Sequence, residues 1–370
     1  MIPFINVRAQ REAYLSEFKQ AEQEVLDSGC FIGGPVVQAL ESELAEFTGA
    51  KHAITCGSGT DALTIALLAL GLKPGDEVIV PDFTFIAPAE CVMRLGGIPK
   101  FADIDAETLQ ISAKSIEARI SEKTRGIIAV NLFGQCAPYA EIRKCTCANN
   151  LWLIEDSAQA FGATQNGVPA CTFGDISITS FYPAKPLGCY GDGGALFTAN
   201  DELAQKIRLI ANHGSQTRYI HEICGMNSRL DALQAAVLRV KLRHFKDELK
   251  KRSENARKYN KFFAKCNSAA DSANGAKIEP QKIASGNTST YAQYTVLAED
   301  RKSFIEKLDD AEIPYCIHYP QPLHTQPCFK GLNQGLGNSN AIEACQKVVS
   351  LPMCAFTDVD DIIARLKKEM

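Results

Sequence analysis

Short apolar runs alternate with helical patterns between about residues 50 and 210, and this alternation leaves few architectures open. Runs that are apolar on both faces are typical of a mostly parallel sheet with helices on both sides. Their alternation with helices predicts an α/β layer fold with right-handed crossovers. The predicted strands are 52–56, 77–80, 98–102, 126–130, 151–154, 176–181 and 195–198.

The pattern changes at Ser228, where a helical stretch without proline or glycine continues to Cys266. Its length would carry the chain from one domain into another. A polar connection is expected over 267–289, followed by a small α+β unit. We therefore predict a large domain over 1–245, whose N-terminal segment could pack on the small domain, and a small C-terminal domain over 246–370. The expected strands of the small unit are 290–297 and 314–317, and its expected helices lie near 302–308, 340–349 and 359–368.

Composition excludes several classes of function. The 370 residues carry 39 Lys and Arg against 43 Asp and Glu, a formal net charge of −4, so the chain lacks the basic footprint of a nucleic-acid-binding protein. No apolar run approaches the roughly 20 residues that span a bilayer, and no secretory signal is expected from the polar pattern of the first residues. The 14 cysteines include no Cys-x-x-Cys pair, so we expect free thiols and no metal site. These features predict a cytoplasmic protein that binds neither nucleic acid nor membrane.

Two segments that follow predicted strands have residues suited to ligand binding, because ligands of such sheets bind at the carboxyl ends of the strands. Gly57–Asp61 precedes an apolar helix, and its backbone N–H groups suit a phosphate. A plain turn with Thr60 or Asp61 as the helix cap is the alternative. Asp156 follows the strand at 151–154, where it could cap the next helix or hold a proton on a cationic ring nitrogen.

Lys185 stands between Pro183 and Pro186, directly after the predicted strand 176–181. Most lysines are solvated surface charges. Here desolvation would lower the pKa of the amine from about 10.4, and a neutral amine can attack a carbonyl to form a Schiff base. A fourth segment, 225–231, opens the long helix and is read either as a simple helix cap or as part of the same site.

A phosphate cup, a ring-nitrogen carboxylate and a Schiff-base lysine, each at a strand end, together describe a site for pyridoxal 5′-phosphate (PLP). The chain resembles the sugar aminotransferases of the DegT/DnrJ/EryC1/StrS family, which are PLP enzymes of fold type I. This resemblance implies a large domain with a mostly parallel seven-stranded sheet between helices, plus a smaller α+β C-terminal domain. It covers nearly the whole chain and rests on the stretches GSGTDAL, VPDFTFIAPAE, IEDSAQAFGA, SFYPAKPLGCYGDGGA, NHGS and GMNSRLDALQAAVL.

The resemblance also implies roles around the cofactor ring. Lys185 would form the Schiff base with PLP and later carry the proton between two carbons. Asp156 would pair with the pyridinium nitrogen and keep it protonated. Gln159 would hydrogen-bond the ring hydroxyl, and Phe85 would stack on the ring face.

Further family positions concern the phosphate and a second subunit. Gly59, Thr60 and Ser180 would hold the phosphate of PLP. Asn227 would reach that phosphate from the neighbouring subunit. The resemblance therefore implies a homodimer with shared active sites.

The implied reaction moves an amino group from glutamate, which leaves as 2-oxoglutarate, to a nucleotide-linked keto-sugar. Within the family the chain is most similar to enzymes that aminate C3 of UDP-2-acetamido-2-deoxy-3-keto-glucuronic acid for bacterial surface polysaccharide, such as lipopolysaccharide. C4 amination of a UDP-4-keto-6-deoxy sugar and a non-catalytic regulator on the same fold are the alternatives. The expected neighbours of the sugar are Phe31, Tyr182, Arg229, His318 and Tyr319.

Overall fold

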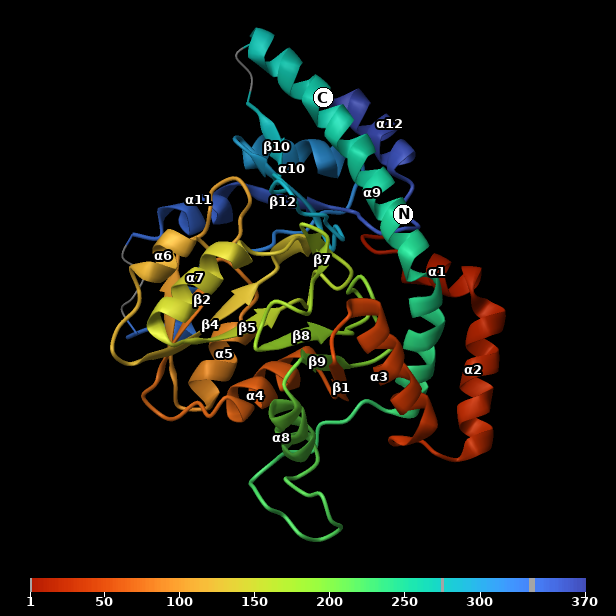
Figure 1. The fold of residues 1–370 in the computed structure, drawn as a ribbon. Helices are drawn as coiled ribbons and strands as arrows, with labels where there is room; N and C mark the ends of the chain where they lie inside the picture. Colours follow the sequence, from red (N-terminus) through yellow and green to blue (C-terminus); the bar gives the residue numbers. More distant parts are fainter. Residues whose placement is uncertain (1, 274–275, 333–336) are drawn as a thin grey trace.

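The large domain is built on a seven-stranded sheet in the order β1-β9-β8-β5-β4-β2-β3. The computed structural model describes residues 2–273, 276–332 and 337–370 (Figure 1). Strand β9 runs antiparallel to both of its neighbours, and the other pairs are parallel, so the predicted mostly parallel sheet is confirmed. The strands are β1 (His52–Cys56), β2 (Glu77–Pro81), β3 (Ile98–Ala102), β4 (Thr124–Val130), β5 (Trp152–Asp156), β8 (Ile176–Ser180) and β9 (Gly194–Thr198).

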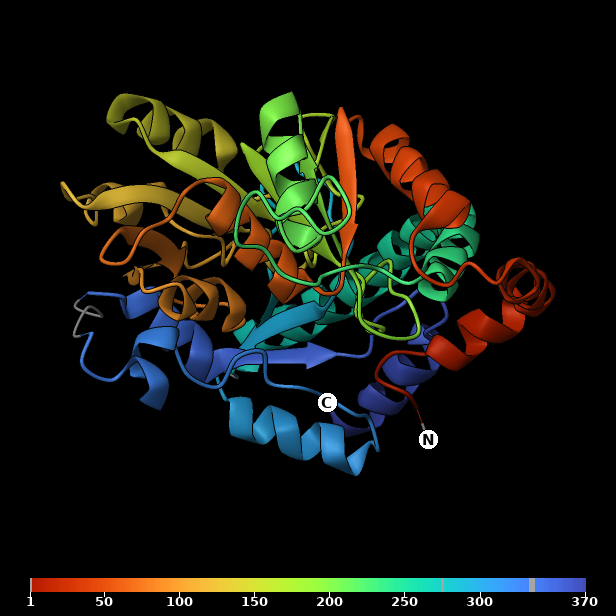
Figure 2. The same cartoon turned by 90° about the horizontal axis from the view of Figure 1, so that it is seen from below.

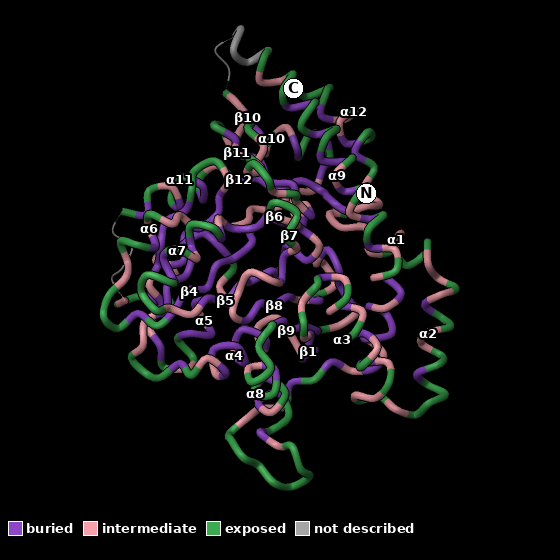
Figure 3. Tube along the Cα trace, viewed as in Figure 1, coloured by how far each residue is buried: buried purple, intermediate pink, exposed green. Residues whose placement is uncertain are grey.

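Helices cover both faces of this sheet (Figure 2). Successive strand residues alternate between the two faces. Val78 and Val80 pack in one apolar cluster with α4, α5 and α8, whereas Ile79 packs in another with α6 and α7. Both faces are therefore buried, as the apolar runs predict (Figure 3). These helices are α4 (Gly59–Ala69), α5 (Ala87–Arg94), α6 (Ala113–Glu117), α7 (Tyr139–Asn149) and α8 (Asp201–Ala211).

Helix α9 (Ala232–Ala273) is 42 residues long and runs from the large domain into the small one (Figure 1). Its first turns pack with N-terminal helices against the sheet, and its later turns pack on the small sheet β10-β11-β12. The remaining elements are α1 (Val7–Ala13), α2 (Leu15–Ser28), α3 (Gly34–Thr48), β6 (Thr164–Gln165), β7 (Val168–Pro169), β10 (Ile278–Pro280), β11 (Tyr294–Ala298), α10 (Arg301–Asp310), α11 (Ser339–Lys347), β12 (Val348–Leu351) and α12 (Val359–Glu369), with the 3₁₀ turns η1 (Leu132–Gly134), η2 (Leu323–Thr325) and η3 (Pro327–Phe329).

The N-terminal segment contacts the small domain. The side chain of Ile2 packs against the apolar cluster of α9, α10, α12 and the small sheet. The carbonyl of Phe4 accepts a hydrogen bond of 3.3 Å from the backbone N–H of Met353. The division at residue 245 stays a prediction, because α9 passes through that position without a break.

The small domain departs from the predicted elements in several places, and the strand expected over 290–297 is observed as β11, which begins at Tyr294. Among the described residues, the expected strand at 314–317 makes only one isolated bridge, Cys316 to Ser350 of β12, and does not extend into a strand. The helix expected over 340–349 ends at Lys347, and the β-branched residues after it pair with β11 as β12. The connection expected over 267–289 begins as the end of α9, and residues 274–275 lie outside the described part of the chain.

Within the described ranges, no helix combines the length and the apolar character that a bilayer span requires.

Strand β9 is pressed against the loop that opens α4. A Cβ on Gly194 would lie 2.6 Å from the carbonyl carbon of Ser58. We expect Gly194→Ala to lower the free energy of unfolding by about 1–3 kcal/mol, because backbone must move to admit the methyl group. Gly191→Ala is the matched control, since its Cβ would lie 3.4 Å from Gln234 in ordinary contact. Urea unfolding would measure both, and equal stability of the two variants would contradict the close approach.

Candidate active site

One cavity of about 530 Å³ lies at the carboxyl ends of the central strands. Its wall combines the ends of β4, β5 and β8, the first turn of α4 and residues of the C-terminal domain. Residues far apart in the sequence therefore meet here, as expected for the switch region of such a sheet. The cavity brings together the predicted residues Gly59, Thr60, Phe85, Asp156, Gln159, Ser180, Tyr182, Lys185, His318 and Tyr319.

Asp156 is the last residue of β5, and its side chain lines the cavity. Its Oδ1 accepts a hydrogen bond of 2.9 Å from the backbone N–H of Ala158. Burial raises the pKa of the carboxyl group to about 6, although that hydrogen bond and the charge of Lys185 oppose the shift. The carboxylate is thus held in a place where a nearby cation would stabilise its charge.

Lys185 lies in a turn after β8 and lines the same cavity. Its backbone N–H donates a hydrogen bond of 2.8 Å to the carbonyl of Tyr182. Burial lowers the pKa of the Lys185 amine below its ordinary value, and the charge of Asp156 opposes this effect. A desolvated amine that loses its proton more readily is suited to nucleophilic attack.

The first turn of α4 forms a close-fitting end of the cavity. Ser58 caps the helix, because its Oγ accepts a hydrogen bond of 3.0 Å from the backbone N–H of Asp61. A Cβ on Gly59 would lie 2.7 Å from Cβ of Ser180, so only glycine allows this approach. The free N–H groups of a helix N-terminus attract anions. Gly59, Thr60 and Ser180 therefore have the arrangement of a phosphate cradle.

Gln159 and Tyr319 form a polar wall. The Oε1 of Gln159 accepts a hydrogen bond of 2.7 Å from the backbone N–H of Phe133, and its Nε2 lies 3.3 Å from the hydroxyl of Tyr319. Burial raises the pKa of Tyr319, so this hydroxyl keeps its proton. Phe85 is 54% exposed at the cavity mouth, with its ring centroid 6.4 Å from that of Tyr319.

His318 stays neutral in this setting. Burial, with a smaller effect of the Lys185 charge, lowers the pKa of its imidazole to about 4. Its Nδ1 lies 3.0 Å from the Oγ of Ser350, so the ring is held by a residue of β12. A neutral imidazole at the cavity wall can donate or accept a hydrogen bond without adding charge.

Two cavity residues escape the sequence reasoning. Thr84 Oγ1 and Gln293 Oε1 are buried in the wall, and neither has a hydrogen-bond partner within the described parts of the chain. Buried polar atoms are rarely left unpaired, so both fit a bound polar ligand. Thr84 directly precedes Phe85 and could have been found from that position, whereas Gln293 carries no local signal. The amine, the carboxylate, the anion cradle and these orphaned atoms together fit PLP.

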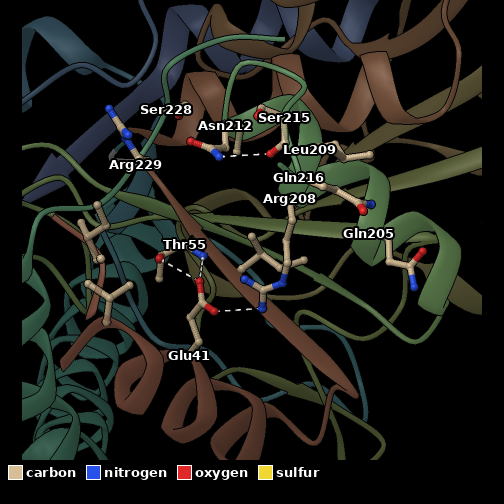
Figure 4. A pocket seen from close by; sticks show the side chains of 15 residues that line it. Glu41, Thr55, Gln205, Arg208, Leu209, Asn212, Ser215, Gln216, Ser228 and Arg229 are labelled. Carbon is tan, nitrogen blue, oxygen red and sulfur yellow. Dashed lines mark hydrogen bonds and ion pairs between the residues drawn. The ribbon is translucent and has the colours of Figure 1, made fainter. Parts of the chain in front are cut away.

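Three predicted residues lie outside this cavity. Arg229 lines a separate pocket of about 470 Å³ between α3, β1 and α8, near the ion pair of Glu41 and Arg208 (Figure 4). Asn227 is exposed and bridges to Asn212. Phe31 is 47% exposed. Within a single chain these side chains do not join the site, so their roles stay predictions.

Comparison with known proteins gives a consistent family. A model of the DegT/DnrJ/EryC1/StrS aminotransferase family matches residues 13–367. A UDP-2-acetamido-2-deoxy-3-oxo-D-glucuronate aminotransferase of Pseudomonas aeruginosa is 43% identical over 98% of this chain and 98% of its own. A pleiotropic regulatory protein of Geobacillus stearothermophilus is 40% identical over 95% of this chain and 93% of its own. A UDP-N-acetyl-3-dehydro-alpha-D-glucosamine 3-aminotransferase of Acidithiobacillus ferrooxidans is 38% identical over 95% and 92%.

Solved structures agree with this result. A DegT/DnrJ/EryC1/StrS aminotransferase from Brucella abortus superposes with a TM-score of 0.93 at 36% identity, over 100% of this chain and 99% of that one. NtdA from Bacillus subtilis, solved with bound cofactor PMP, superposes with a TM-score of 0.88 at 28% identity, over 96% and 82%. Both the fold and the type of cofactor are therefore shared with solved relatives.

Asp156 predicts a pH dependence of stability in the protein freed of ligand. Because its pKa is raised on folding from 3.8 to about 6, ionisation weakens the folded state as the pH rises through this window. We expect Asp156→Asn to unfold like the native chain below pH ~4 and to be more stable by up to about 3 kcal/mol above pH ~6. Urea unfolding across this pH range measures the difference, and a variant less stable at pH 7 would contradict the assigned environment.

Proposed function

Because the chain belongs to the DegT/DnrJ/EryC1/StrS aminotransferase family, we propose that it aminates C3 of UDP-2-acetamido-2-deoxy-3-keto-glucuronic acid. The family uses PLP, and the reaction class rests on one observation: Lys185, Asp156 and the first turn of α4 face a single cavity. The choice of sugar is supported by the 43% identity to the Pseudomonas aeruginosa aminotransferase named above.

The residues of the cavity have separable tasks in this reaction. Bound PLP supplies a ring that accepts the electron pair released at the carbon that gains or loses nitrogen. The Nζ of Lys185 would hold the cofactor aldehyde and, once an incoming amino group has freed it, would move a proton between that carbon and the aldehyde carbon of the cofactor. The carboxylate of Asp156 would hold the proton on the ring nitrogen by its charge. The N–H groups at Gly59 and Thr60, with the hydroxyl of Ser180, would hold the phosphate.

Glutamate is the proposed amino donor, and 2-oxoglutarate is its product. Both half-reactions would use the same cavity, so the sugar and the amino acid would bind one after the other. Tyr182, His318 and Tyr319 line this cavity and are proposed to face whichever substrate is bound. The neutral imidazole of His318 suits a hydrogen bond to a sugar hydroxyl.

A homodimer with shared sites is the proposed assembly. Residues 215–224 form a loop that projects from the large domain (Figures 1 and 3). This loop exposes the apolar side chains of Tyr219 and Ile220. Asn227 and Arg229 follow it and lie outside the cavity of their own chain. A partner copy that covers the loop would bring Asn227 to the phosphate and Arg229 to the sugar carboxylate, for which its planar fork is suited.

Cellular role and location follow from the proposed substrate. Nucleotide-linked sugars and glutamate are cytoplasmic metabolites, so we place the enzyme in the cytoplasm. Its product would serve bacterial surface polysaccharide, for example lipopolysaccharide. The similarity to a pleiotropic regulatory protein makes a non-catalytic regulator the second candidate function. The regulatory alternative is disfavoured, because a protein that catalyses no reaction would need neither the Lys185 amine nor the Asp156 carboxylate in the cavity.

Competition among keto-sugars tests the substrate. With PLP and glutamate, we expect kcat/KM for the 3-keto-glucuronate to exceed that for the carboxylate-free 3-keto sugar by about 10- to 100-fold, the effect of one charge-assisted contact. The UDP-4-keto-6-deoxy sugar should react more slowly still. Lys185→Ala is the inactive control, and its rate should fall by roughly a thousandfold or more while it stays folded. Coupled detection of 2-oxoglutarate gives the rates, and absence of turnover with the 3-keto-glucuronate would refute this choice of sugar.

Mixed dimers test the shared site. Lys185→Ala and Asn227→Ala are each expected to have little activity alone, since each damages both sites of its dimer. A mixed dimer would retain one intact site, so an equimolar mixture refolded together should recover up to about a quarter of the native activity. No recovery, despite mixed dimers seen by mass spectrometry, would show that Asn227 serves its own chain.

A further inference from the structure

A buried lysine of the large domain is left unexplained by the proposed reaction. Lys241 lies on α9 and is only 2% exposed. Burial lowers the pKa of its amine to about 8, opposed chiefly by the charge of Glu248. Removing an ammonium group from water is unfavourable unless partners replace the water. The groups that contact the Lys241 amine therefore indicate which part of the structure this residue stabilises.

The amine of Lys241 contacts the turn that carries Lys185. Its Nζ donates a hydrogen bond of 2.6 Å to the carbonyl oxygen of Gly188, three residues after Lys185. It also lies 4.6 Å from the centre of the Tyr190 ring, a cation–π distance. Both partners belong to the stretch that follows the proposed catalytic lysine.

This turn is compact, so fixing the position of Gly188 also fixes the backbone position of Lys185. A Cβ on Gly188 would lie 2.5 Å from the carbonyl oxygen of Tyr182, which leaves no space for adjustment there. That same carbonyl accepts the backbone N–H of Lys185 at 2.8 Å. The backbone N–H of Cys189 closes the turn by a 2.8 Å hydrogen bond to the carbonyl of Phe181.

Helix α9 holds the turn at a second point. The Oε1 of Gln234 accepts a hydrogen bond of 2.8 Å from the backbone N–H of Tyr190. Gln234 and Lys241 are seven residues apart, or about two helical turns, and so lie on the same face of α9. Two side chains on the same face of one helix therefore bind the turn, one as acceptor and one as donor.

We propose that Lys241 is a positioning residue, which fixes the Lys185 amine relative to Asp156 by holding the carbonyl of Gly188. This inference rests on the proposed function, because it assigns Lys241 a task in presenting Lys185 to PLP. Lys241 itself does not line the cavity. The same helix continues into the small domain, where Arg252 donates to the carbonyl of Tyr291 at 3.1 Å. The position of the turn is thereby tied to the element that joins the two domains.

Three variants of the PLP-loaded protein test this role. Lys241→Met keeps the length of the side chain and removes the donor, whereas Lys241→Gln keeps a donor. Arg252→Met is the matched control, since it removes a buried cation of α9 whose partners lie in the small domain. The measurements are the melting temperature, the affinity for added PLP, and the pH midpoint at which the visible absorbance of bound PLP changes.

We expect Lys241→Met to weaken PLP binding by about 10- to 100-fold and to shift the absorbance midpoint, because small displacements of a reacting group are costly. Lys241→Gln should recover most of the affinity, and Arg252→Met should lower the melting temperature while leaving the midpoint unchanged. A Lys241→Met protein with native affinity and midpoint would overturn the proposal. If that variant does not fold, Lys241→Gln decides: a small residual shift of the midpoint that Arg252→Met does not show supports the tether, and a lowered melting temperature with the native midpoint, as in Arg252→Met, overturns it. Failure of the proposed function is distinct: a wrong choice of sugar would leave the PLP absorbance and these comparisons unchanged, whereas a chain that does not bind PLP would show no such absorbance even without a substitution.

Discussion

The site depends on the close approach of the first turn of α4 to the ends of β8 and β9. Gly59 and Gly194 permit this approach, because a side chain at either position would meet neighbouring atoms at under 3 Å. The cap at Ser58 then starts the helix at the sheet edge, with its N–H groups directed at the cavity. Glycine is required at both positions because there is no space for a side chain. The close approach places the N–H groups of the first turn of α4 beside the strand ends, in an arrangement suited to an anion.

Burial acts on the two titratable groups of the site in opposite directions. It raises the pKa of Asp156 and lowers that of Lys185, so each group is less charged than it would be in water. Each also stabilises the charge of the other, which limits both shifts. In the free protein, the desolvation of these two groups is a free-energy cost of folding. A cationic ring bound beside Asp156 would reduce that cost by stabilising the carboxylate. The buried Oγ1 of Thr84 and Oε1 of Gln293, which have no hydrogen-bond partner within the described residues, add to this desolvation cost.

Helix α9 connects the turn that carries Lys185 to the small domain, whose residues form the opposite wall of the cavity. Near its start it holds the turn that carries Lys185, and farther along it binds the carbonyls of Tyr291 and Met353 in the small domain. His318 and Tyr319 reach the cavity from that domain. A rigid helix therefore sets the distance between the turn that carries Lys185 and the opposite wall, which loops alone could not do.

The amino-acid sequence by itself determined the order of the strands along the chain, the long helix and the presence of Lys185, Asp156 and Gly59 at strand ends, because these depend on local apolar patterns and glycine turns. Only the tertiary structure decided that Gln293 faces the cavity and that Lys241 binds the turn that carries Lys185. Such contacts join residues dozens of positions apart, and no local pattern encodes which of two distant side chains will meet. For the same reason the prediction of a strand at 314–317 was wrong. Its pairing depends on the sheet edge formed by β12, far along the chain, and only Cys316 of this described segment makes a bridge to that edge.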